Sequence, residues 1–425
     1  MRLVIHNAKL DGEPVTVSVN QGVIDAIKKA NKSSGTEAAK AKVIDAGGKH
    51  LVPSLKNGHT HAAMTLLRGF ADDMKLQPWL EEKIWPIEAS LSPEQLYWGT
   101  RLAILEMIKS GTTFSNDMYF HFPDAWRAYQ DGGIKAAVGP AVFDFFDKKE
   151  GKKARRQLEA YFEEYGVGDR RVRFSPAPHA IYTVSEETLR WVADFSRKND
   201  LPLHIHLSET EKEVRDCIAA HGVPPAEYLE SIGFLGPNVI AAHALWLGDR
   251  EVEILAVRGV TVVHNPVSNM KLASGSCFPF ARLKEREVPM MLGTDGCSSN
   301  NNLDMLEEMK IASILQKQHF GDPELMTAEE IFTVGTGARS SVYPHISGKI
   351  EVGAPADLLL VTEEVPSMVP THRLISNLVY SAGTEAVDTV ICDGEVLMEG
   401  RRVPGEEEVL AEARRHAAQL VAAAR

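Results

Sequence analysis

Cysteine is scarce in this sequence, and its placement argues against both a disulfide framework and a thiolate metal site. The chain of 425 residues contains 4 cysteines, and none falls in a C-x-x-C or other paired spacing. We interpret them as buried thiols of a protein from a reducing compartment. Long hydrophobic runs are absent too. No stretch approaches the roughly 18 apolar residues of a membrane span, and the first residues lack the apolar core of a signal peptide. We therefore predict a cytoplasmic protein with no membrane partner.

Positive charge is also in deficit. Lysine and arginine total 46 against 58 aspartate and glutamate residues, which gives a formal net charge of -12. Because these charges form no long blocks, the balance disfavours nucleic acid and anionic membranes as partners and favours a small-molecule ligand. The length suits one large domain with a small one. The sequence leaves open whether the chain forms a homo-oligomer.

The two ends of the chain share a strand-rich pattern. Residues 1–52 alternate apolar and polar positions between glycine, asparagine and aspartate breaks, which predicts short antiparallel strands. The pattern returns in residues 349–425. This region finishes with an alanine-rich segment, EEEVLAEARRHAAQLVAAAR, that we predict to be a docking helix. We expect the two ends to build one small flanking β-sandwich.

Residues 53–348 alternate strand-like runs with longer helical segments. IKAAVGPAVF precedes KARRQLEAYFEEY, for example, and VRFSPAPH precedes SEETLRWVADFSRKN. About eight such units predict a parallel (β/α)8 TIM-like barrel, with a doubly wound open sheet as the alternative. In such barrels the catalytic groups lie where the strands end.

Two histidines end the first strand expected in this region. The stretch NGHTHAAMTLLRG places His59 and His61 two positions apart, so in an extended strand both side chains point to the same side and can bind one ion. Chance alone produces such pairs, and the sequence holds a second one at His204 and His206. The argument therefore depends on further ligands in the right order along the chain.

Further candidates end later strands of the expected barrel, namely His206, His243 and Asp295. With the first pair, His206 and Asp295 make a set of three histidines and one carboxylate. Such a set leaves room for a water molecule and suits a catalytic zinc or iron ion.

This order of residues at successive strand ends resembles the amidohydrolase superfamily. Within it, several stretches are similar to the deaminases of methylthioadenosine, S-adenosylhomocysteine and related adenine nucleosides: NGHTHAAMTLLRGFADDMKLQPWL, HLSET, HNPVSNMKLASG, LGTDGCSSNNNLDM and SGKIEVGAPADLLL. The resemblance covers essentially the whole chain. It implies hydrolytic removal of the 6-amino group of an adenine nucleoside, which gives an inosine-type product and ammonia.

The resemblance also implies one divalent metal ion, with zinc as the first expectation and iron(II) as the alternative. Its ligands would be His59, His61, His206 and Asp295. Many superfamily members bridge two metals with a carbamylated lysine at the end of the fourth strand. That strand reads VRFSPAPHAIY here and offers no lysine, so we expect a single ion.

Three residues would then be catalytic. Glu209 matches a proton-shuttling carboxylate, Asp295 would accept the proton of the attacking water, and His243 would orient or polarise the nucleophile. Considered alone, Glu209 also fits a surface carboxylate before a capped helix, and His243 a buried structural histidine.

The resemblance places substrate contacts as well. Glu88 would bind the ribose diol, and His179 would lie at the nucleoside end of the pocket. Trp79 and Trp85, on the long loop after the first strand, are candidates to line the pocket. The alternative for Glu88 is a solvated residue ahead of a helix. We leave His264 outside the metal set as a structural or supporting residue.

The 5′ side departs from the resemblance. Relatives that accept S-adenosylhomocysteine place arginine near its carboxylate, one of them on the strand that reads IKAAVGPAVFDFF here. Residues 134–146 contain no arginine, and a lysine does not replace a bidentate arginine equivalently. We expect small or apolar 5′ groups, or a larger uncharged or aromatic one, to be preferred over S-adenosylhomocysteine. The basic segment 148–156 is the alternative partner for its carboxylate.

Two other functions stay open. Chlorohydrolases and deaminases of other aromatic rings, such as triazines, guanine or pterins, use the same ligands, although a ribose-binding Glu88 has no purpose there. The second open function is that of a non-catalytic protein with the same fold. The presence of every expected ligand and of Glu209 disfavours it.

Overall fold

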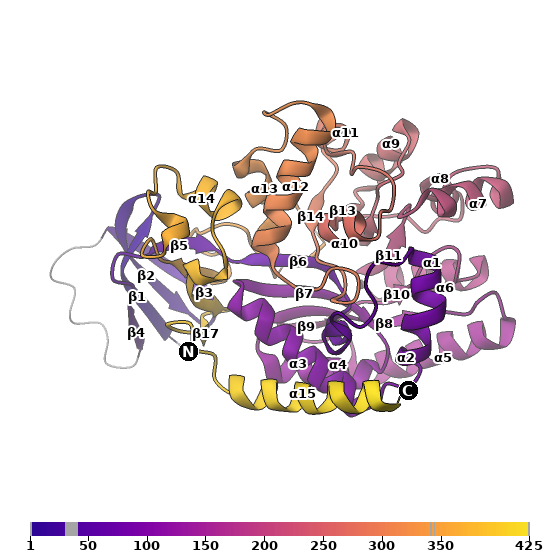
Figure 1. The fold of residues 1–425 in the computed structure, drawn as a ribbon, viewed down its shortest axis with the longest axis horizontal. Coiled ribbons are helices and arrows are strands. Elements are labelled where there is room, and N and C mark those ends of the chain that lie inside the picture. Colours follow the sequence, from indigo (N-terminus) through magenta and orange to yellow (C-terminus); the bar gives the residue numbers. More distant parts are fainter. Residues whose placement is uncertain (1, 30–40, 341, 344, 424–425) are drawn as a thin grey trace.

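The computed structural model describes residues 2–29, 41–340, 342–343 and 345–423, and its strands form two sheets (Figure 1). The strands of the larger sheet are β6 (Leu55–Thr60), β7 (Thr112–Tyr119), β8 (Lys135–Val142), β9 (Val172–Phe174), β10 (Ala177–Pro178), β11 (Leu203–Leu207), β12 (Val239–His243), β13 (Thr261–His264) and β14 (Met290–Leu292). Those of the smaller sheet are β1 (Arg2–Leu10), β2 (Glu13–Asn20), β3 (Val23–Lys29), β4 (Lys42–Asp45), β5 (His50–Pro53), β15 (Leu358–Val361), β16 (Val387–Cys392) and β17 (Glu395–Met398).

The larger sheet is a closed parallel barrel. Its order is β10-β8-β7-β6-β14-β13-β12-β11, and β9 also pairs with β8. Both β9 and β10 pair with β8, one after the other along its length, so together they fill one strand position of the barrel. The barrel closes where His204 N donates to Pro176 O over 3.0 Å and His206 N donates to His179 O over 3.0 Å. The predicted (β/α)8 barrel is confirmed, and the open sheet is excluded.

Helices pack around this barrel (Figure 1). Those that follow its strands are α3 (Pro93–Lys109), α4 (Phe122–Gly132), α5 (Lys148–Tyr165), α6 (Glu186–Lys198), α7 (Glu211–His221), α8 (Pro225–Ser231), α9 (Asp249–Arg258), α10 (Pro266–Lys271), α11 (Phe280–Glu285), α12 (Met305–Phe320) and α13 (Ala328–Gly335). Every residue of β11 and of β12 is buried. This is expected of parallel strands that are covered by helices outside and by one another inside.

The smaller sheet joins both ends of the chain. Its order is β17-β16-β15-β5-β1-β2-β3, with β4 paired to β1, so the predicted flanking unit of both ends is present as one continuous hydrogen-bonded sheet. The prediction of antiparallel strands holds for β1, β2 and β3. It is wrong for β4, which pairs with β1 in parallel, and right only in part for β5, which is parallel to β1 and antiparallel to β15. The reason is that β5 lies between β1 and β15, a strand from the other end of the chain.

The two sheets meet where β5 ends at Pro53 and β6 begins at Leu55. Buried ion pairs cross this junction. Asp357, directly before β15, lies 3.2 Å from Lys56 Nζ on β6 and 2.9 Å from Lys135 Nζ on β8. Both lysines are almost fully buried, and removing one partner of such a pair is strongly destabilising. We propose the domain boundaries after residues 52 and 348 on this basis.

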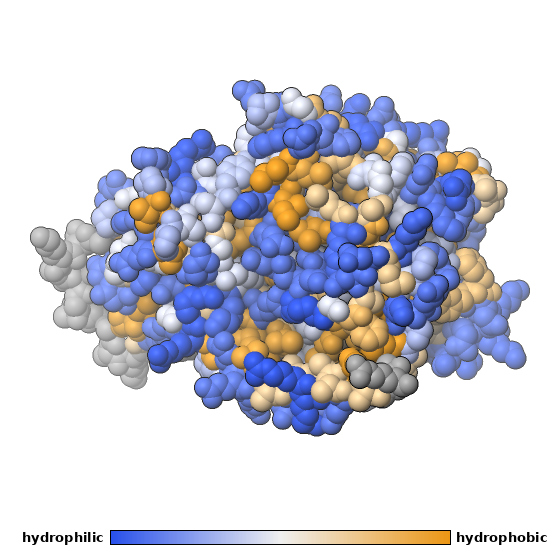
Figure 2. Space-filling model, in the orientation of Figure 1, coloured by the Kyte–Doolittle hydropathy of each residue, from blue (hydrophilic) through white to orange (hydrophobic). Residues whose placement is uncertain are grey.

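Two more helices complete the chain, α14 (Leu374–Tyr380) and α15 (Glu406–Ala423). As predicted for the alanine-rich segment, α15 docks on the barrel, where it lies along α3, and Lys109 Nζ lies 2.8 Å from Glu406 Oε1 (Figure 1). The surface on this side is mostly hydrophilic, with hydrophobic residues in patches interrupted by charged ones (Figure 2). Among the described residues, no helix combines the length and hydropathy that crossing a membrane requires. All four cysteines are buried and free.

Candidate active site

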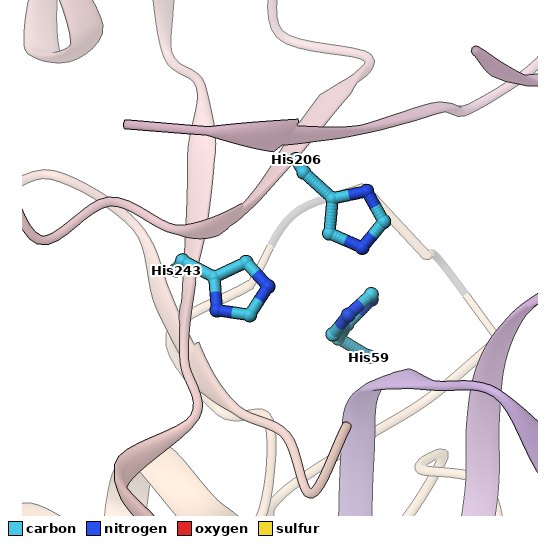
Figure 3. A group of neighbouring side chains, drawn as sticks. All are labelled: His59, His206 and His243. Atoms are coloured by element: carbon cyan, nitrogen blue, oxygen red, sulfur yellow. The ribbon is translucent and has the colours of Figure 1, made fainter. Parts of the chain in front are cut away.

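The predicted ligands meet at the end of the barrel where its strands terminate. His59 belongs to β6 and His61 follows it, while His206 and His243 lie at the ends of β11 and β12. Asp295 follows β14. Figure 3 shows the rings of His59, His206 and His243 pointing toward one another.

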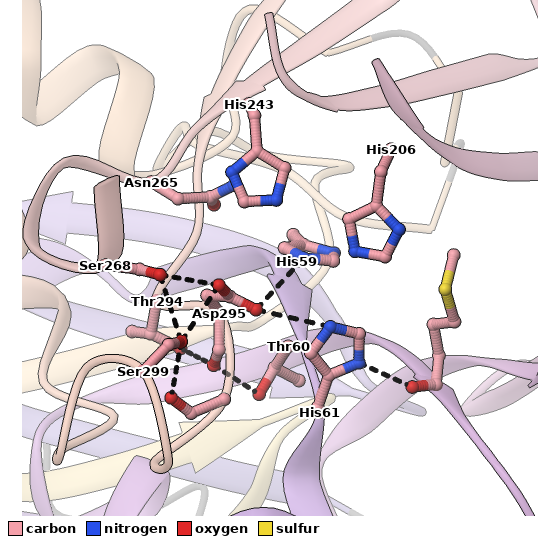
Figure 4. Close-up of polar contacts among 12 residues, drawn as sticks. His59, Thr60, His61, His206, His243, Asn265, Ser268, Thr294, Asp295 and Ser299 are labelled. Atoms are coloured by element: carbon pink, nitrogen blue, oxygen red, sulfur yellow. Dashed lines mark hydrogen bonds and ion pairs between the residues drawn. The ribbon is translucent and has the colours of Figure 1, made fainter. Parts of the chain in front are cut away.

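The donor atoms are close enough to share one ion. Asp295 Oδ1 lies 3.3 Å from His59 Nε2 and 3.2 Å from His61 Nε2 (Figure 4). The ligand atoms of His59, His61 and Asp295 lie within 4.8 Å of one another, and so do those of His59, His206 and His243. The structure thus brings together all the residues that the sequence nominated as ligands, with His243 beside them.

Hydrogen bonds to backbone carbonyls fix the ring orientation of two histidines. His61 Nδ1 donates to Met118 O over 2.7 Å, and His206 Nδ1 donates to His179 O over 2.8 Å. Because a carbonyl oxygen only accepts, each Nδ1 carries a proton, and in the neutral ring the lone pair is on Nε2, which faces the common centre. These residues fit a divalent cation, since metal ligation requires unprotonated imidazole nitrogens.

Burial sets the charge of this cluster. It lowers the pKa of His59 to about 4 and that of His206 well below its usual value, so both rings are neutral at physiological pH. Burial opposes ionisation of Asp295, but hydrogen bonds from His59 and His61 outweigh it and hold the pKa of Asp295 well below its usual range. Burial likewise opposes a charge on His61, but the hydrogen bond to Asp295 and its negative charge raise the pKa of His61 to about 9. A divalent ion that binds here would therefore displace the proton on His61 Nε2.

Asp295 is held from behind by two hydroxyl groups. Its Oδ2 accepts hydrogen bonds from Ser268 Oγ over 2.6 Å and Ser299 Oγ over 3.0 Å, which leaves Oδ1 facing His59 and His61 (Figure 4). Its backbone has a φ of 62°, a strained left-handed conformation that persists only where the surroundings enforce it. Here the hydrogen bond from Asp295 N to His59 O, 3.0 Å long, contributes to that constraint.

Glu209 lies inside the site rather than on the surface. Its side chain is buried, and Oε2 lies 3.8 Å from His243 Nε2. The helix α7 begins after it, with Thr210 as its N-cap, so the surface-carboxylate interpretation is wrong. Burial and, secondly, the charge of Asp295 raise the pKa of Glu209 to about 8. The carboxyl group is therefore protonated at neutral pH and can donate a proton.

His243 presents a donor to the centre. Its Nδ1 faces the amide nitrogens of Asn269, at 2.9 Å, and Asn265, at 3.3 Å. Because both amides donate, Nδ1 is the acceptor and the proton of the neutral ring is on Nε2. This tautomer has no lone pair for a metal on Nε2 but can donate to the oxygen of a water molecule, the role predicted for His243.

Glu88 is buried at the end of the short helix α2 (Trp85–Glu88), so the solvated interpretation is wrong. Tyr119 Oη donates to Glu88 Oε1 over 2.5 Å. Burial raises the pKa of Glu88 to about 7. Tyr119 was missed from the sequence, although its place at the end of β7 is the same signal that identified the ligands.

One cavity is lined by Tyr119, Phe143 and Tyr182. Most of the predicted residues line the same cavity, namely His61, Trp79, Trp85, Glu88, His179, His206, Glu209, His243 and Asp295. His179 stacks on Phe143 at a centroid distance of 4.6 Å. Trp79 and Trp85 belong to short helices, α1 (Leu76–Trp79) and α2, so the prediction of a loop is wrong there.

His264 and Glu213 are two further buried residues near the site. His264 lies outside both ligand groups and stacks on Phe278 at 4.3 Å, in agreement with its exclusion from the metal set. Glu213 was missed from the sequence. Its carboxylate accepts the backbone N–H groups of Ser208 and Glu209, each over 2.9 Å, and so fixes the segment that carries Glu209.

Comparisons with known proteins agree with this arrangement. A family model described as the amidohydrolase family matches residues 50–397. The chain is 50% identical over 380 residues to a 5′-deoxyadenosine deaminase of Methanoregula boonei, which covers 89% of this chain and 86% of that protein. It is 46% identical over 416 residues to 5-methylthioadenosine/S-adenosylhomocysteine deaminase 1 of Archaeoglobus fulgidus, which covers 96% of each. A crystal structure of an adenosine deaminase from Xanthomonas campestris with bound zinc is 33% identical, has a TM-score of 0.90, and covers 99% of this chain and 98% of its own.

Proposed function

The chain belongs to the amidohydrolase family, and we propose that it is a metal-dependent enzyme that removes the 6-amino group of adenine nucleosides. Its substrates are 5′-deoxyadenosine, methylthioadenosine, adenosine or another 5′-modified adenosine, and its products are the inosine-type nucleoside and ammonia. One observation carries this proposal: a single cavity is lined by His61, His206 and Asp295 of the ligand set, by Glu209 and by the buried carboxylate of Glu88. The names of the most similar relatives support the same substrate class.

The metal site consists of His59, His61, His206 and Asp295, and we assign it one zinc ion, with iron(II) as the alternative. The zinc-bound relative from Xanthomonas campestris supports this choice. Once bound, a divalent ion lowers the pKa of a water molecule enough to supply a nucleophile at neutral pH.

The protein groups then move the protons. Asp295 Oδ1 accepts the proton that the attacking water loses, and His243 Nε2–H donates a hydrogen bond to the water oxygen. Glu209 protonates N1 of the purine as the new C–O bond forms at C6, which keeps charge off the ring. The ionised Glu209 then takes up the proton of the C6 hydroxyl and passes it to the amino group, which leaves as ammonia while C6=O forms. The proton held by Asp295 finally restores Glu209. Each role agrees with the protonation state of the group: burial keeps Glu209 protonated and His243 neutral, and hydrogen bonds from the histidines keep Asp295 ionised.

Glu88 and His179 hold the nucleoside. An ionised Glu88 accepts hydrogen bonds from the two ribose hydroxyls, and such charge-assisted bonds are the strong ones. The competing function, hydrolysis of another aromatic ring such as a triazine, guanine or a pterin, offers no ribose diol to this buried carboxylate. We assign the protein to the cytoplasm, in agreement with its four free thiols.

One experiment tests the proposal. Protein of known zinc and iron content is incubated with adenosine, 5′-deoxyadenosine, methylthioadenosine, S-adenosylhomocysteine, guanine and a chlorotriazine, and ammonia release and ultraviolet absorbance are followed. We expect rapid deamination of the nucleosides with apolar 5′ groups. Turnover of guanine or the triazine without turnover of any adenine nucleoside would refute the assignment.

A further inference from the structure

A second cavity continues the active site beyond Glu88. Its water-accessible volume is about 520 Å³, against about 70 Å³ for the cavity next to the ligand set. The two share a common wall, which includes Trp85, Glu88 and Tyr119. Most of the free space open to a ligand therefore lies beyond Glu88. We name this second cavity the aromatic annex.

Aromatic rings form its walls. The ring of Phe143 stacks on Phe120 and on Phe145, each at a centroid distance of 5.6 Å. The indole of Trp85 meets the edge of Phe145 at 6.2 Å. Leu158 and Tyr161 of α5 close the opposite side. The annex therefore offers flat, apolar surfaces on which another ring can stack.

The outermost ring is held in place by a constrained turn. Phe145 and Phe146 both have positive φ, 44° and 63°, which is unusual for bulky residues. The buried carboxylate of Asp144 maintains this turn because it accepts hydrogen bonds from Phe146 N over 3.0 Å and from Ser185 N over 2.8 Å. Phe145 stays largely exposed at the mouth of the annex as a result.

Cationic side chains are missing from this wall. Among the described residues that line the annex, none is lysine or arginine, and the one acidic residue is Glu88. In the basic segment 148–156, Arg155 is paired with Glu187 at 2.8 Å. The carboxylate of a homocysteine group would thus enter a largely apolar space that contains a carboxyl group and no lysine or arginine, with His121, Gln157 and Tyr161 among its polar side chains, which is unfavourable.

The orientation of the nucleoside decides what enters the annex. This step rests on the proposed function: with C6 beside the ligand set and the ribose hydroxyls at Glu88, the substituent on C5′ continues past Glu88. We propose that the annex is a binding site for a large uncharged 5′ substituent, an aryl or branched alkyl thioether, so that the enzyme deaminates 5′-arylthio adenosines as well as 5′-deoxyadenosine.

The test compares 5′-deoxyadenosine with 5′-benzylthio-5′-deoxyadenosine and S-adenosylhomocysteine. For the wild-type protein we expect kcat/KM for the benzylthio compound to equal or exceed that for 5′-deoxyadenosine, and to exceed that for S-adenosylhomocysteine by about tenfold or more. Differences of about 10–200-fold are what a hydrophobic pocket achieves.

A variant that fills the annex gives the second comparison. Ala154 lines it from α5, whereas Ala160 on the same helix is exposed and outside the lining. We expect Ala154→Phe to lower kcat/KM for the benzylthio compound by about tenfold and to leave 5′-deoxyadenosine turnover unchanged. The matched control, Ala160→Phe, should change neither, and turnover of 5′-deoxyadenosine reports that each variant is folded.

The outcomes separate the two proposals. Deamination of 5′-deoxyadenosine with poor turnover of the benzylthio compound by wild type overturns the annex proposal alone. An equal loss for both substrates in Ala154→Phe overturns it too. If no adenine nucleoside is deaminated, the proposed function and the annex proposal are both wrong.

Discussion

Tyr119 and Glu88 are joined by a hydrogen bond of 2.5 Å between Tyr119 Oη and Glu88 Oε1. The tyrosine ends barrel strand β7 and the carboxylate ends helix α2, so the bond joins this short helix to the barrel. It leaves the second oxygen of Glu88 free for the substrate. The bond also accounts for a carboxylate that is buried without a cationic partner.

Glu88→Ala should raise KM for adenosine and 5′-deoxyadenosine by about tenfold or more, because two ribose hydroxyls lose a charged acceptor worth roughly 1.5–3 kcal/mol per bond. Tyr119→Phe keeps the carboxylate and should raise KM less. Steady-state kinetics on both variants test this, with Glu82→Ala, an exposed glutamate just ahead of α2, as the control. An unchanged KM in Glu88→Ala would remove Glu88 from the ribose site.

His59→Ala and Asp295→Ala should each lose bound metal and activity together, since a site that is short of one ligand binds its ion weakly. Metal content by mass spectrometry, measured beside ammonia release, checks both effects. His221→Ala alters an exposed histidine on α7 and should change neither. Full occupancy and normal turnover in His59→Ala would exclude the proposed ligand set.

The barrel and the positions of the ligands could be predicted from the sequence because their signals are local. His59 and His61 end one strand with the two-residue period that turns both side chains to the same side. His206, His243 and Asp295 end further apolar runs, and in a parallel barrel all strand ends meet on one face.

The remaining features depend on contacts between distant parts of the chain. No local pattern pairs Tyr119 with Glu88 or directs the carboxylate of Glu213 to the backbone of Glu209. Trp79 and Trp85 lie in short helices rather than in the predicted loop, and the proline of α2 is tolerated because it lies in the first turn of that helix.

Glu209→Gln should retain its metal, and its kcat should be about 10²–10⁴-fold lower than that of wild type, which is the usual contribution of general acid–base catalysis. The amide keeps the shape of the side chain but can neither give a proton to N1 nor pass one to the leaving ammonia. Glu211→Gln, on the exposed face of α7, is the matched control. A kcat of Glu209→Gln within about threefold of wild type would exclude Glu209 as the shuttle.

The dependence of kcat/KM on pH should have two limbs. Glu88, with its pKa raised to about 7, becomes the stronger acceptor as it ionises, so kcat/KM increases as pH rises through that value. Glu209, with its pKa raised to about 8, loses the proton that it donates, so kcat/KM decreases above that value. Glu88→Gln should abolish the rising limb and keep the falling one. A rising limb that survives in Glu88→Gln belongs to another group.

Asn269→Asp should reverse the tautomer of His243. The amide of Asn269 donates to His243 Nδ1 over 2.9 Å, whereas a carboxylate of the same shape accepts and draws the proton from Nε2 to Nδ1. The donor that faces the water oxygen is then lost. Removal of one such donor costs about 10²–10³ in kcat.

Metal content separates this effect from a loss of the site. Asn269→Asp should keep its metal, because His243 Nε2 is no ligand in the wild-type tautomer, and the control Asn20→Asp on the surface of the small sheet should match wild type in metal content and turnover. Nitrogen chemical shifts of the His243 ring, measured by NMR, report which nitrogen carries the proton. Wild-type kcat in Asn269→Asp, together with a shift of the proton to Nδ1, would show that His243 does not act through an Nε2–H donor.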